Sequence, residues 1–426
     1  MREKINIEHH LKLNKILSVI FVGGFAFLLS ATIDTVYADN AYEVPRVRSA
    51  RTFLDDKILK GPHHTVRDRV STDGYLHRFT VDSDFGVFKV TGDSALRKLV
   101  KEIAAIAELR EIKQSDVFAQ AVKSAAKAPF QFAGNLIEDP VDTVAAIPSG
   151  LFRIFENVAA GITEKHDPSE DSRLKQALFV SSWKRDFAKQ FGVDVYSSNK
   201  VLQEELNSVG WAGAIGGLTV SAATAPLSGT VAVVAKAGRL ADSIGNVLGE
   251  QPPSRLRIEN DKILRKLKIP KKTRDEFLDH PAFTPRHDTV ITLSLAALNT
   301  TQDHQKFLEA ALAARDEIDA NLFEDMAETF AFYHLNESPI VRFDVYKGLV
   351  LALARNGAAV FAVPLDHGAW TRTPERIFTE LAQNYPASGK LELWVTGTVS
   401  DRVKRELSAR GIKLVEDIDR RFEYFD

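Results

Sequence analysis

After residue 357, apolar runs typical of strands alternate with segments whose apolar residues have helical spacing. This alternation constrains the fold of the chain more than any other feature. Three short apolar runs, at 358–365, 391–395 and 412–415, have the length and composition of strands. Between them lie two helical patterns, one opened by Thr373-Pro374 and one capped by Ser400. Strand–helix–strand–helix–strand predicts a small parallel sheet with right-handed crossovers.

The rest of the chain reads as mostly helical. We therefore predict an α+β fold, predominantly helical, with a helical N-terminal and central region followed by a small C-terminal parallel βαβαβ unit. The expected divisions are a signal peptide at 1–38, an extended segment with a β-hairpin at 39–92, a helical region at 93–253 that includes an apolar hairpin at 209–235, a basic and helical region at 254–340, and an α/β unit at 341–426.

Several elements can be placed from local signals. Tyr75–Val81 and Phe85–Val90 alternate as the strands of a hairpin, and a helix follows from Gly92-Asp93-Ser94 to about Ile112. Ser198 and Asn199 start a further helix. Thr284 and Pro285 occupy the N-cap and first position of another that reaches Leu298. A longer helical pattern runs from Gln302 to Leu335, with a break expected near Ala320-Asn321.

The N-terminus has the layout of a secretory signal. Lys12 and Lys15 precede an apolar run, Ile16–Leu29, and Val36-Tyr37-Ala38 supplies small or moderate residues before Asp39. We expect cleavage after Ala38 and a periplasmic or envelope-associated mature protein. An uncleaved anchor is the alternative, because the 18 uncharged residues of 16–33 could just span a bilayer.

The composition excludes some classes of protein. The formal net charge is −2, which argues against a dedicated nucleic-acid binder, so we expect no nucleic-acid partner. Cysteine is absent, so neither disulfides nor acylation on cysteine can contribute, and stability has to come from packing. We expect no cofactor.

Two apolar segments suggest contact with a membrane or a partner. Prolines break the amphipathic pattern of 115–165 into short helices. Residues 209–235 carry no charge over 27 residues and include Trp211 and a Gly213-x-x-x-Gly217 spacing, which lets two helices approach closely. A buried helical hairpin, shallow insertion into a bilayer and an interface with another subunit all fit this second segment.

A basic stretch follows at 254–274, with nine basic residues against two acidic ones. In an exported protein the expected partner is an anionic membrane surface, with another envelope protein as the alternative. A solvated face remains the simplest interpretation of the charge. The candidate contact residues are Arg265, Lys266, Lys268, Lys271 and Lys272.

The candidate ligand site lies at the ends of the predicted parallel strands. Asp366-His367 follows the first strand and Thr396-Gly397-Thr398 follows the second. Ligands of α/β sheets bind at carboxyl ends of strands, and a hydroxyl-rich loop before a helix start can hold an anion. Asp366, His367, Thr396 and Thr398 are therefore the predicted ligand-binding residues, although ordinary turn chemistry also accounts for them.

No catalytic or metal-binding motif is evident. His63-His64 reads as a surface pair, and His280, His287 and Asp288 match no spacing of metal ligands. Glu324 and Glu328 lie one turn apart, and we expect both to be solvated. We therefore predict no metal site and assign no catalytic residue.

The C-terminal half resembles an uncharacterised family of exported proteobacterial proteins. The resemblance rests on Phe283-Thr284-Pro285-Arg286, on AFYH at 331–334 and on WVTGT at 394–398, and it covers roughly 280–415. The family has no assigned activity. The resemblance implies an envelope location and no mechanism.

Together these patterns favour an exported envelope protein that is not an enzyme and that associates with a membrane surface or a partner. Two other functions fit the sequence. One is a small-ligand binder or enzyme that uses the C-terminal α/β unit. The other is a subunit of an envelope complex that packs 209–235 against another chain.

Overall fold

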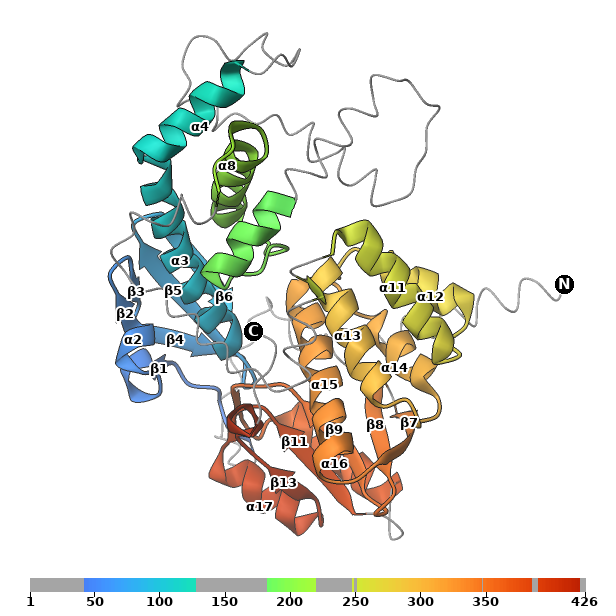
Figure 1. Ribbon diagram of the computed structural model, residues 1–426. Helices are drawn as coiled ribbons and strands as arrows, with labels where there is room; N and C mark the ends of the chain where they lie inside the picture. Colours follow the sequence, from blue (N-terminus) through green and yellow to red (C-terminus); the bar gives the residue numbers. More distant parts are fainter. Residues whose placement is uncertain are drawn as a thin grey trace, which may run out of the picture.

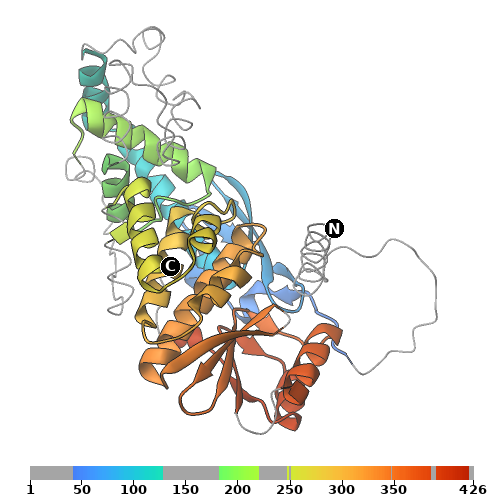
Figure 2. The same ribbon diagram turned by 90° about the vertical axis from the view of Figure 1, so that its right-hand side faces the viewer.

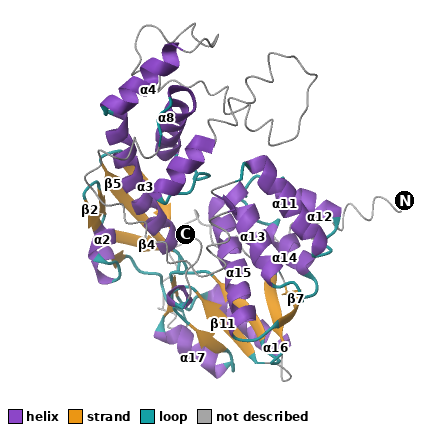
Figure 3. Cartoon of the chain, viewed as in Figure 1, coloured by secondary structure: helices purple, strands orange, loops and turns teal. Residues whose placement is uncertain are grey.

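The computed structural model describes residues 42–127, 182–219, 247–248, 251–346, 348–384 and 390–421. Their strands gather in two separate larger sheets, each with its own helices (Figure 3). The predicted signal peptide, most of the proline-broken segment and residues 220–235 lie outside the described residues.

The first sheet is antiparallel and lies in the N-terminal part of the chain. Its longest strand, β5 (His77–Ser83), pairs along one edge with β6 (Gly86–Thr91). Along its other edge β5 pairs with β4 (Arg69–Thr72) near its start and with β3 (His64–Val66) near its end. Two-residue strands complete the edges: β1 (Arg48–Ser49) beside β4, and β2 (Lys60–Gly61) beside β3. Two short helices, η1 (Ala50–Thr52) and α2 (Asp56–Leu59), join them.

One long helix, α3 (Asp93–Lys113), belongs to two cores in succession. Leu96, Leu99 and Ile103 pack against the first sheet, on Phe79 and Val81. The second half of α3 packs in a helical cluster with α4 (Asp116–Lys127), α8 (Lys200–Gly216) and a helix at 182–191. Figure 1 shows these helices stacked above the N-terminal sheet. An apolar stripe that continues over five turns allows α3 to join the two layers.

The second sheet is mixed and has the strand order β13-β11-β9-β8-β7. Its antiparallel half is the hairpin of β7 and β8, and its parallel half is made by β9, β11 and β13. The strands are β7 (Ile340–Tyr346), β8 (Leu349–Ala354), β9 (Ala359–Val363), β11 (Leu391–Val395) and β13 (Lys413–Val415). Beside it, β10 (His367–Gly368) and β12 (Thr398–Val399) form a two-stranded parallel ladder, and η2 (Ile418–Arg420) follows β13.

Helices cover both faces of the second sheet. Alternate residues of its strands point to opposite sides, and the buried apolar side chains on each side pack against helices. Val360, Ala362 and Trp394 face a core made with α13 (Pro285–Ala297), α14 (His304–Ala311) and α15 (Glu317–Asn336). Phe361 and Leu393 face α16 (Arg372–Asn384) and α17 (Asp401–Ala409). Figure 2 shows the sheet between these two groups of helices. Two further helices, α11 (Pro253–Lys266) and α12 (Lys271–Leu278), pack on the α13–α14 layer.

Backbone hydrogen bonds join the two parts of the molecule. The amide of Asp366 donates to the carbonyl of Tyr75 over 2.9 Å, and the amide of Ala369 donates to that of Gly74 over 3.0 Å. Two hydrogen bonds join Glu43 and Trp370. The amide of Glu43 donates to the carbonyl of Trp370 at 2.7 Å, and the amide of Trp370 donates to a carboxylate oxygen of Glu43 at 2.6 Å. The loop before β5 is therefore fixed against the end of β9.

The predicted fold class is wrong. The N-terminal region begins with a curled antiparallel sheet, and the parallel strands belong to a larger mixed sheet. Strands β1 to β4 have two to four residues each, too few to show a period of two along the sequence. Tertiary packing on α3 stabilises them instead. The β7–β8 hairpin was missed because Leu349–Ala354 is uniformly apolar, which alone does not separate strand from helix.

Capping residues predicted the ends of helices better than apolar patterns predicted the short strands. Thr284 is the N-cap of α13 with Pro285 at its first position, as predicted, and the helix ends at Ala297, one residue before the predicted Leu298, which is its C-cap. The break in the next helical pattern falls between Ala311 and Glu317, earlier than the predicted Ala320-Asn321. Asp316 accepts the amide of Asp319 and so starts α15 there. Within the described residues, no helix is both long enough and apolar enough to cross a bilayer.

Candidate functional site

A cleft of about 2690 Å³ runs between the N-terminal part of the molecule and the C-terminal α/β part. On one side it is lined by α3 and by residues 183–201, and on the other by α13, α15 and the loops that follow β9, β11 and β13. Charged groups of both signs line it: Arg48, Arg97, Lys98, Arg185, Arg286, Arg420, Asp93, Glu102, Asp194, Glu324, Asp366, Asp417 and Asp419. The carboxyl ends of the parallel strands therefore open into a polar cleft.

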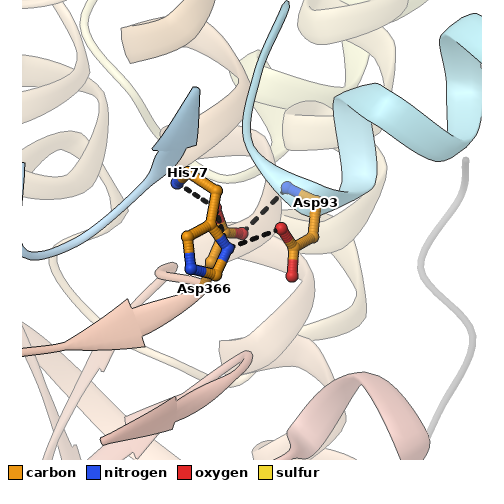
Figure 4. Close-up of side chains that lie close together, drawn as sticks. All are labelled: His77, Asp93 and Asp366. Carbon is orange, nitrogen blue, oxygen red and sulfur yellow. Dashed lines mark hydrogen bonds and ion pairs between the residues drawn. The ribbon is translucent and has the colours of Figure 1, made fainter. Parts of the chain in front are cut away.

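Three ionisable side chains meet in the wall of this cleft, each from a different element. His77 is the first residue of β5, Asp93 is the first residue of α3, and Asp366 follows β9. Their side chains point toward one another (Figure 4). The side chain of His77 is 2% exposed, that of Asp366 is 9% exposed and that of Asp93 is 24% exposed. The cluster is thus accessible mainly through Asp93.

The carboxylate of Asp366 is held by backbone amides from the other half of the molecule. Its Oδ2 accepts the amide of His77 at 2.6 Å, and its Oδ1 accepts the amide of Asp93 at 2.9 Å. The N-cap of α3 is Gly92, which has no side chain to satisfy the first free amides of the helix. Asp366 supplies a cap from 273 residues away in sequence.

The imidazole of His77 is fixed on several sides. Its Nδ1 lies 2.8 Å from Oδ1 of Asp93 and 3.7 Å from Oδ2 of Asp366. Its ring stacks on Phe53 with 4.5 Å between the centroids. A guanidinium nitrogen of Arg48 lies 3.5 Å from Nε2. Stacking and hydrogen bonds leave the ring little freedom to turn.

The electrostatics of the cluster set Asp366 apart from an ordinary surface aspartate. Burial raises the pKa of Asp366 to about 7, and repulsion from the nearby Asp93 carboxylate acts in the same direction. The two amide hydrogen bonds and His77 act against this rise of the pKa. Two carboxylates and one imidazole in a mostly buried position are the kind of group that can exchange a proton or hold a cation near neutral pH.

The structure brings three of the four predicted ligand-binding residues to the cleft. Asp366, Thr396 and Thr398 line the cleft, whereas His367 is not part of its lining. His367 instead pairs with Thr398 in the β10–β12 ladder, and its Nδ1 lies 2.9 Å from the Thr398 hydroxyl. The hydroxyl of Thr396 both donates to the carbonyl and accepts from the amide of Leu365, each at 2.7 Å. Turn and ladder contacts thus account for His367 and Thr396.

The predicted anion-binding loop has its backbone donors engaged. The amide of Gly397 donates to the carbonyl of Leu365 at 2.8 Å, and that of Thr398 donates to the carbonyl of Asp366 at 3.1 Å. Ser400 uses its hydroxyl to accept the amide of Val403 at 3.2 Å. An anion at this loop would have to replace these bonds. The acidic cluster beside the loop is therefore the stronger candidate site.

Glu324 and Glu328 are buried, so the expectation that both are solvated is wrong. Arg286 donates from two nitrogens to one oxygen of Glu324, at 2.7 and 3.1 Å. The other oxygen has no hydrogen-bond partner within the described part of the chain, and Nε2 of His287 lies 3.9 Å away. His287 itself is held by Asn321 at 2.9 Å and by the amide of Thr284 at 3.0 Å. Arg286 and Glu324 line the cleft at its helical side.

The predicted basic contact residues lie on α11, on α12 and on the turn between these two helices, outside the lining of the cleft. All five, Arg265, Lys266, Lys268, Lys271 and Lys272, are exposed. Lys271 pairs with Asp275 at 2.5 Å and Lys272 with Glu276 at 3.7 Å. Acidic residues that follow directly in sequence thus offset part of the local charge. The role of these residues at a membrane or partner stays a prediction.

The described start of the apolar segment packs inside the molecule. Trp211 is half-buried, and α8 ends at Gly216 because Gly217 has φ +74° and acts as its C-cap. A side chain at Gly213 would meet the ring of Trp183. The closest helix contact is at Gly216, where a Cβ would overlap the carbonyl oxygen of Ala121 in α4. A small residue is thus required at Gly216 as well as at Gly213.

Sequence reasoning found Asp366 but missed the two residues that complete its cluster. Asp93 was recognised only as part of a helix start, and His77 appeared as one position in a strand. No local pattern joins residues 77, 93 and 366, since the contact depends on the β9 loop meeting the start of α3. The one available signal was a helix start with glycine at the N-cap, which needs a cap from elsewhere.

Comparisons with known proteins add no family. Neither a protein-family model, nor a curated protein, nor a solved structure matches the chain. The resemblance to exported proteobacterial proteins therefore stays an expectation.

Proposed function

We propose that this chain is an exported protein that binds a small polar ligand in the cleft, with the ligand resting against His77, Asp93 and Asp366. The observation that carries the proposal is the position of this cluster at the carboxyl end of β9, where the two parts of the molecule meet. Ligands of open α/β sheets bind outside the carboxyl ends of the strands. Sites between two parts of a chain are also common ligand sites.

The charged residues that line the cleft favour a polar ligand. Arg48, Arg97, Asp93 and Asp366 all line the cleft, so hydrogen-bond donors and acceptors are both available. The volume of about 2690 Å³ exceeds that of common small-molecule sites, roughly 300–1,000 Å³, so a ligand of that size would fill only part of the cleft. Sugars, amino acids and short dicarboxylates have the size and polarity required.

Thermal unfolding in the presence of such compounds tests the proposal. We expect at least one compound of a panel of sugars, amino acids, dicarboxylates and inorganic phosphate to raise the melting temperature, because a ligand that binds only the folded state stabilises it. The shift should disappear in Ala95→Trp, since Ala95 lines the cleft two residues after Asp93. It should persist in Ala409→Trp, a matched change on the exposed end of α17. Equal shifts in both variants would contradict the proposal.

A further inference from the structure

We propose that His77, Asp93 and Asp366 form a binding site for a divalent transition-metal cation such as Zn²⁺ or Mn²⁺. Each side chain offers one ligand atom, and the three atoms lie within 4.8 Å of one another. The site goes beyond the proposed function, because a cation can bind there whether or not the cleft holds an organic ligand.

The spacing of the ligand atoms fits an ion. Bonds of about 2.0–2.2 Å place neighbouring ligand atoms of a tetrahedral ion about 3.4 Å apart. The Nδ1 atom of His77 lies 2.8 Å from Asp93 and 3.7 Å from Asp366, which brackets that value. At these two contacts of His77 an ion would therefore require shifts of less than about 1 Å. Asp93 is partly exposed, so the remaining coordination positions face the cleft.

The surroundings hold two of the ligands in place. Both oxygens of Asp366 accept a backbone amide, which fixes the carboxylate while leaving each oxygen a second lone pair. Phe53 stacks on the imidazole and fixes its plane. Partners of this kind orient metal ligands and contribute to affinity in known sites.

The charge of the cluster selects the kind of ion. Two carboxylates lie close together in a mostly buried position, and a divalent cation would neutralise both. Carboxylate oxygens alone would suit Mg²⁺ or Ca²⁺, but an imidazole nitrogen favours transition metals. One nitrogen with two oxygens is therefore a donor set for Zn²⁺, Mn²⁺ or Fe²⁺.

The hydrogen bond between Arg48 and His77 competes with metal binding. When Nδ1 of His77 binds an ion, the ring proton has to lie on Nε2, which faces a guanidinium nitrogen of Arg48 at 3.5 Å. Arg48 must then turn away, whereas without an ion it can donate to Nε2 while Nδ1–H donates to Asp93. Replacing Arg48 by glutamine offers an oxygen that accepts the Nε2 proton. Arg48→Gln should therefore tighten metal binding by about tenfold.

Titration calorimetry of the EDTA-treated, dialysed protein with Zn²⁺ and with Mn²⁺ tests the site, and Mn²⁺ electron paramagnetic resonance gives the stoichiometry. We expect one ion per chain. Asp93→Asn and His77→Gln should each weaken binding by more than about a hundredfold, because losing an outer partner alone costs 10–100-fold. Asp417→Asn should bind like the wild type, since Asp417 lines the same cleft outside the cluster.

Two results would overturn the site. One is no saturable binding of either ion by the wild type. The other is binding that survives in both Asp93→Asn and His77→Gln, which would place the ion elsewhere, for example at the exposed His63–Asp84 pair. Thermal unfolding of each variant shows whether it is folded. Because no organic compound is present, failure here leaves the result of the ligand panel independent.

Discussion

At the scale of single residues, the molecule places ionisable groups where each depends on a particular partner. Asp366 holds two amides of the other half of the chain, and Arg286 neutralises one oxygen of the buried Glu324. Removing one member of such a pair leaves a charge in a poorly solvated position, and this costs more than the pair itself contributes. Replacing one member of such a pair should therefore destabilise the protein more than replacing both.

The pair of Arg286 and Glu324 gives the first prediction. Their side chains are 7% and 3% exposed. Arg286→Met should lower the free energy of unfolding by about 3–5 kcal/mol, because the Glu324 carboxylate stays buried without its guanidinium. Arg286→Met combined with Glu324→Leu should recover most of that loss. Urea unfolding of the three proteins is the measurement, and a double variant less stable than the single one would contradict the account.

His304 gives a prediction about pH. Burial lowers the pKa of His304, although its ring nitrogen lies 3.0 Å from the carbonyl oxygen of Leu298 and that contact favours the charged form. The unfolded chain therefore binds a proton at a higher pH than the folded chain does. The stability due to neutral His304 is complete above the unfolded pKa and is lost as the pH falls from the unfolded pKa through the lower folded pKa.

His304→Gln should accordingly flatten the pH dependence of unfolding. The glutamine amide can still donate to the Leu298 carbonyl, but it does not titrate. Urea unfolding free energies measured between about pH 7 and pH 5 should fall less in the variant than in the wild type. An unchanged or steeper fall would show that His304 does not act in this way.

At the scale of elements, sequence patterns predicted caps and the parallel strands better than the sheets. Ser400 and Gly411 bracket α17 and Leu391–Val395 is β11, because these signals act within a few residues. The short strands β1 to β4 carry no such signal, since β3 and β4 form against β5, and β1 and β2 form at the edges beyond them. The candidate site shares this limit. Asp366 follows a recognisable strand, whereas His77 and Asp93 reach it only after both sheets have formed.

The contact of α4 with α8 gives an element-scale prediction. A methyl group at Gly216 would overlap the carbonyl oxygen of Ala121, whereas one at Gly213 would lie 2.8 Å from the ring of Trp183 and 3.0 Å from the carbonyl oxygen of Leu218. Gly216→Ala should therefore destabilise the protein by about 1–3 kcal/mol, despite the better helix propensity of alanine. Gly213→Ala should cost less. Urea unfolding of both variants is the check, and the opposite order would contradict the close approach at Gly216.

At the scale of the whole molecule, the segment before the first sheet joins the two parts. One carboxylate oxygen of Glu43 accepts both the amide of Trp370 and the hydroxyl of Ser400, each at 2.6 Å. These bonds hold the N-terminal segment on the α/β part, next to the loop that carries Asp366. The two walls of the cleft are thus held together by the hydrogen bonds of Glu43 and Asp366.

Glu43→Ala tests this connection. The variant leaves the Trp370 amide and the Ser400 hydroxyl without their acceptor and should lower the free energy of unfolding by about 1–3 kcal/mol. Urea unfolding of the variant and of the wild type is the measurement. Val44→Ala is the matched control, since Val44 is 79% exposed, and it should behave like the wild type. Equal stability of the two variants would contradict a structural role for Glu43.

The most direct test of the cleft as the functional site uses the absence of cysteine from the chain. A single cysteine at Ala95, beside the cluster, can be compared with one at the exposed Ala409. The measurement is the rate at which a neutral thiol reagent labels each cysteine, with and without the most stabilising compound of the panel. The account predicts slower labelling at position 95 and an unchanged rate at 409. Unchanged labelling at position 95 under saturating compound would contradict it.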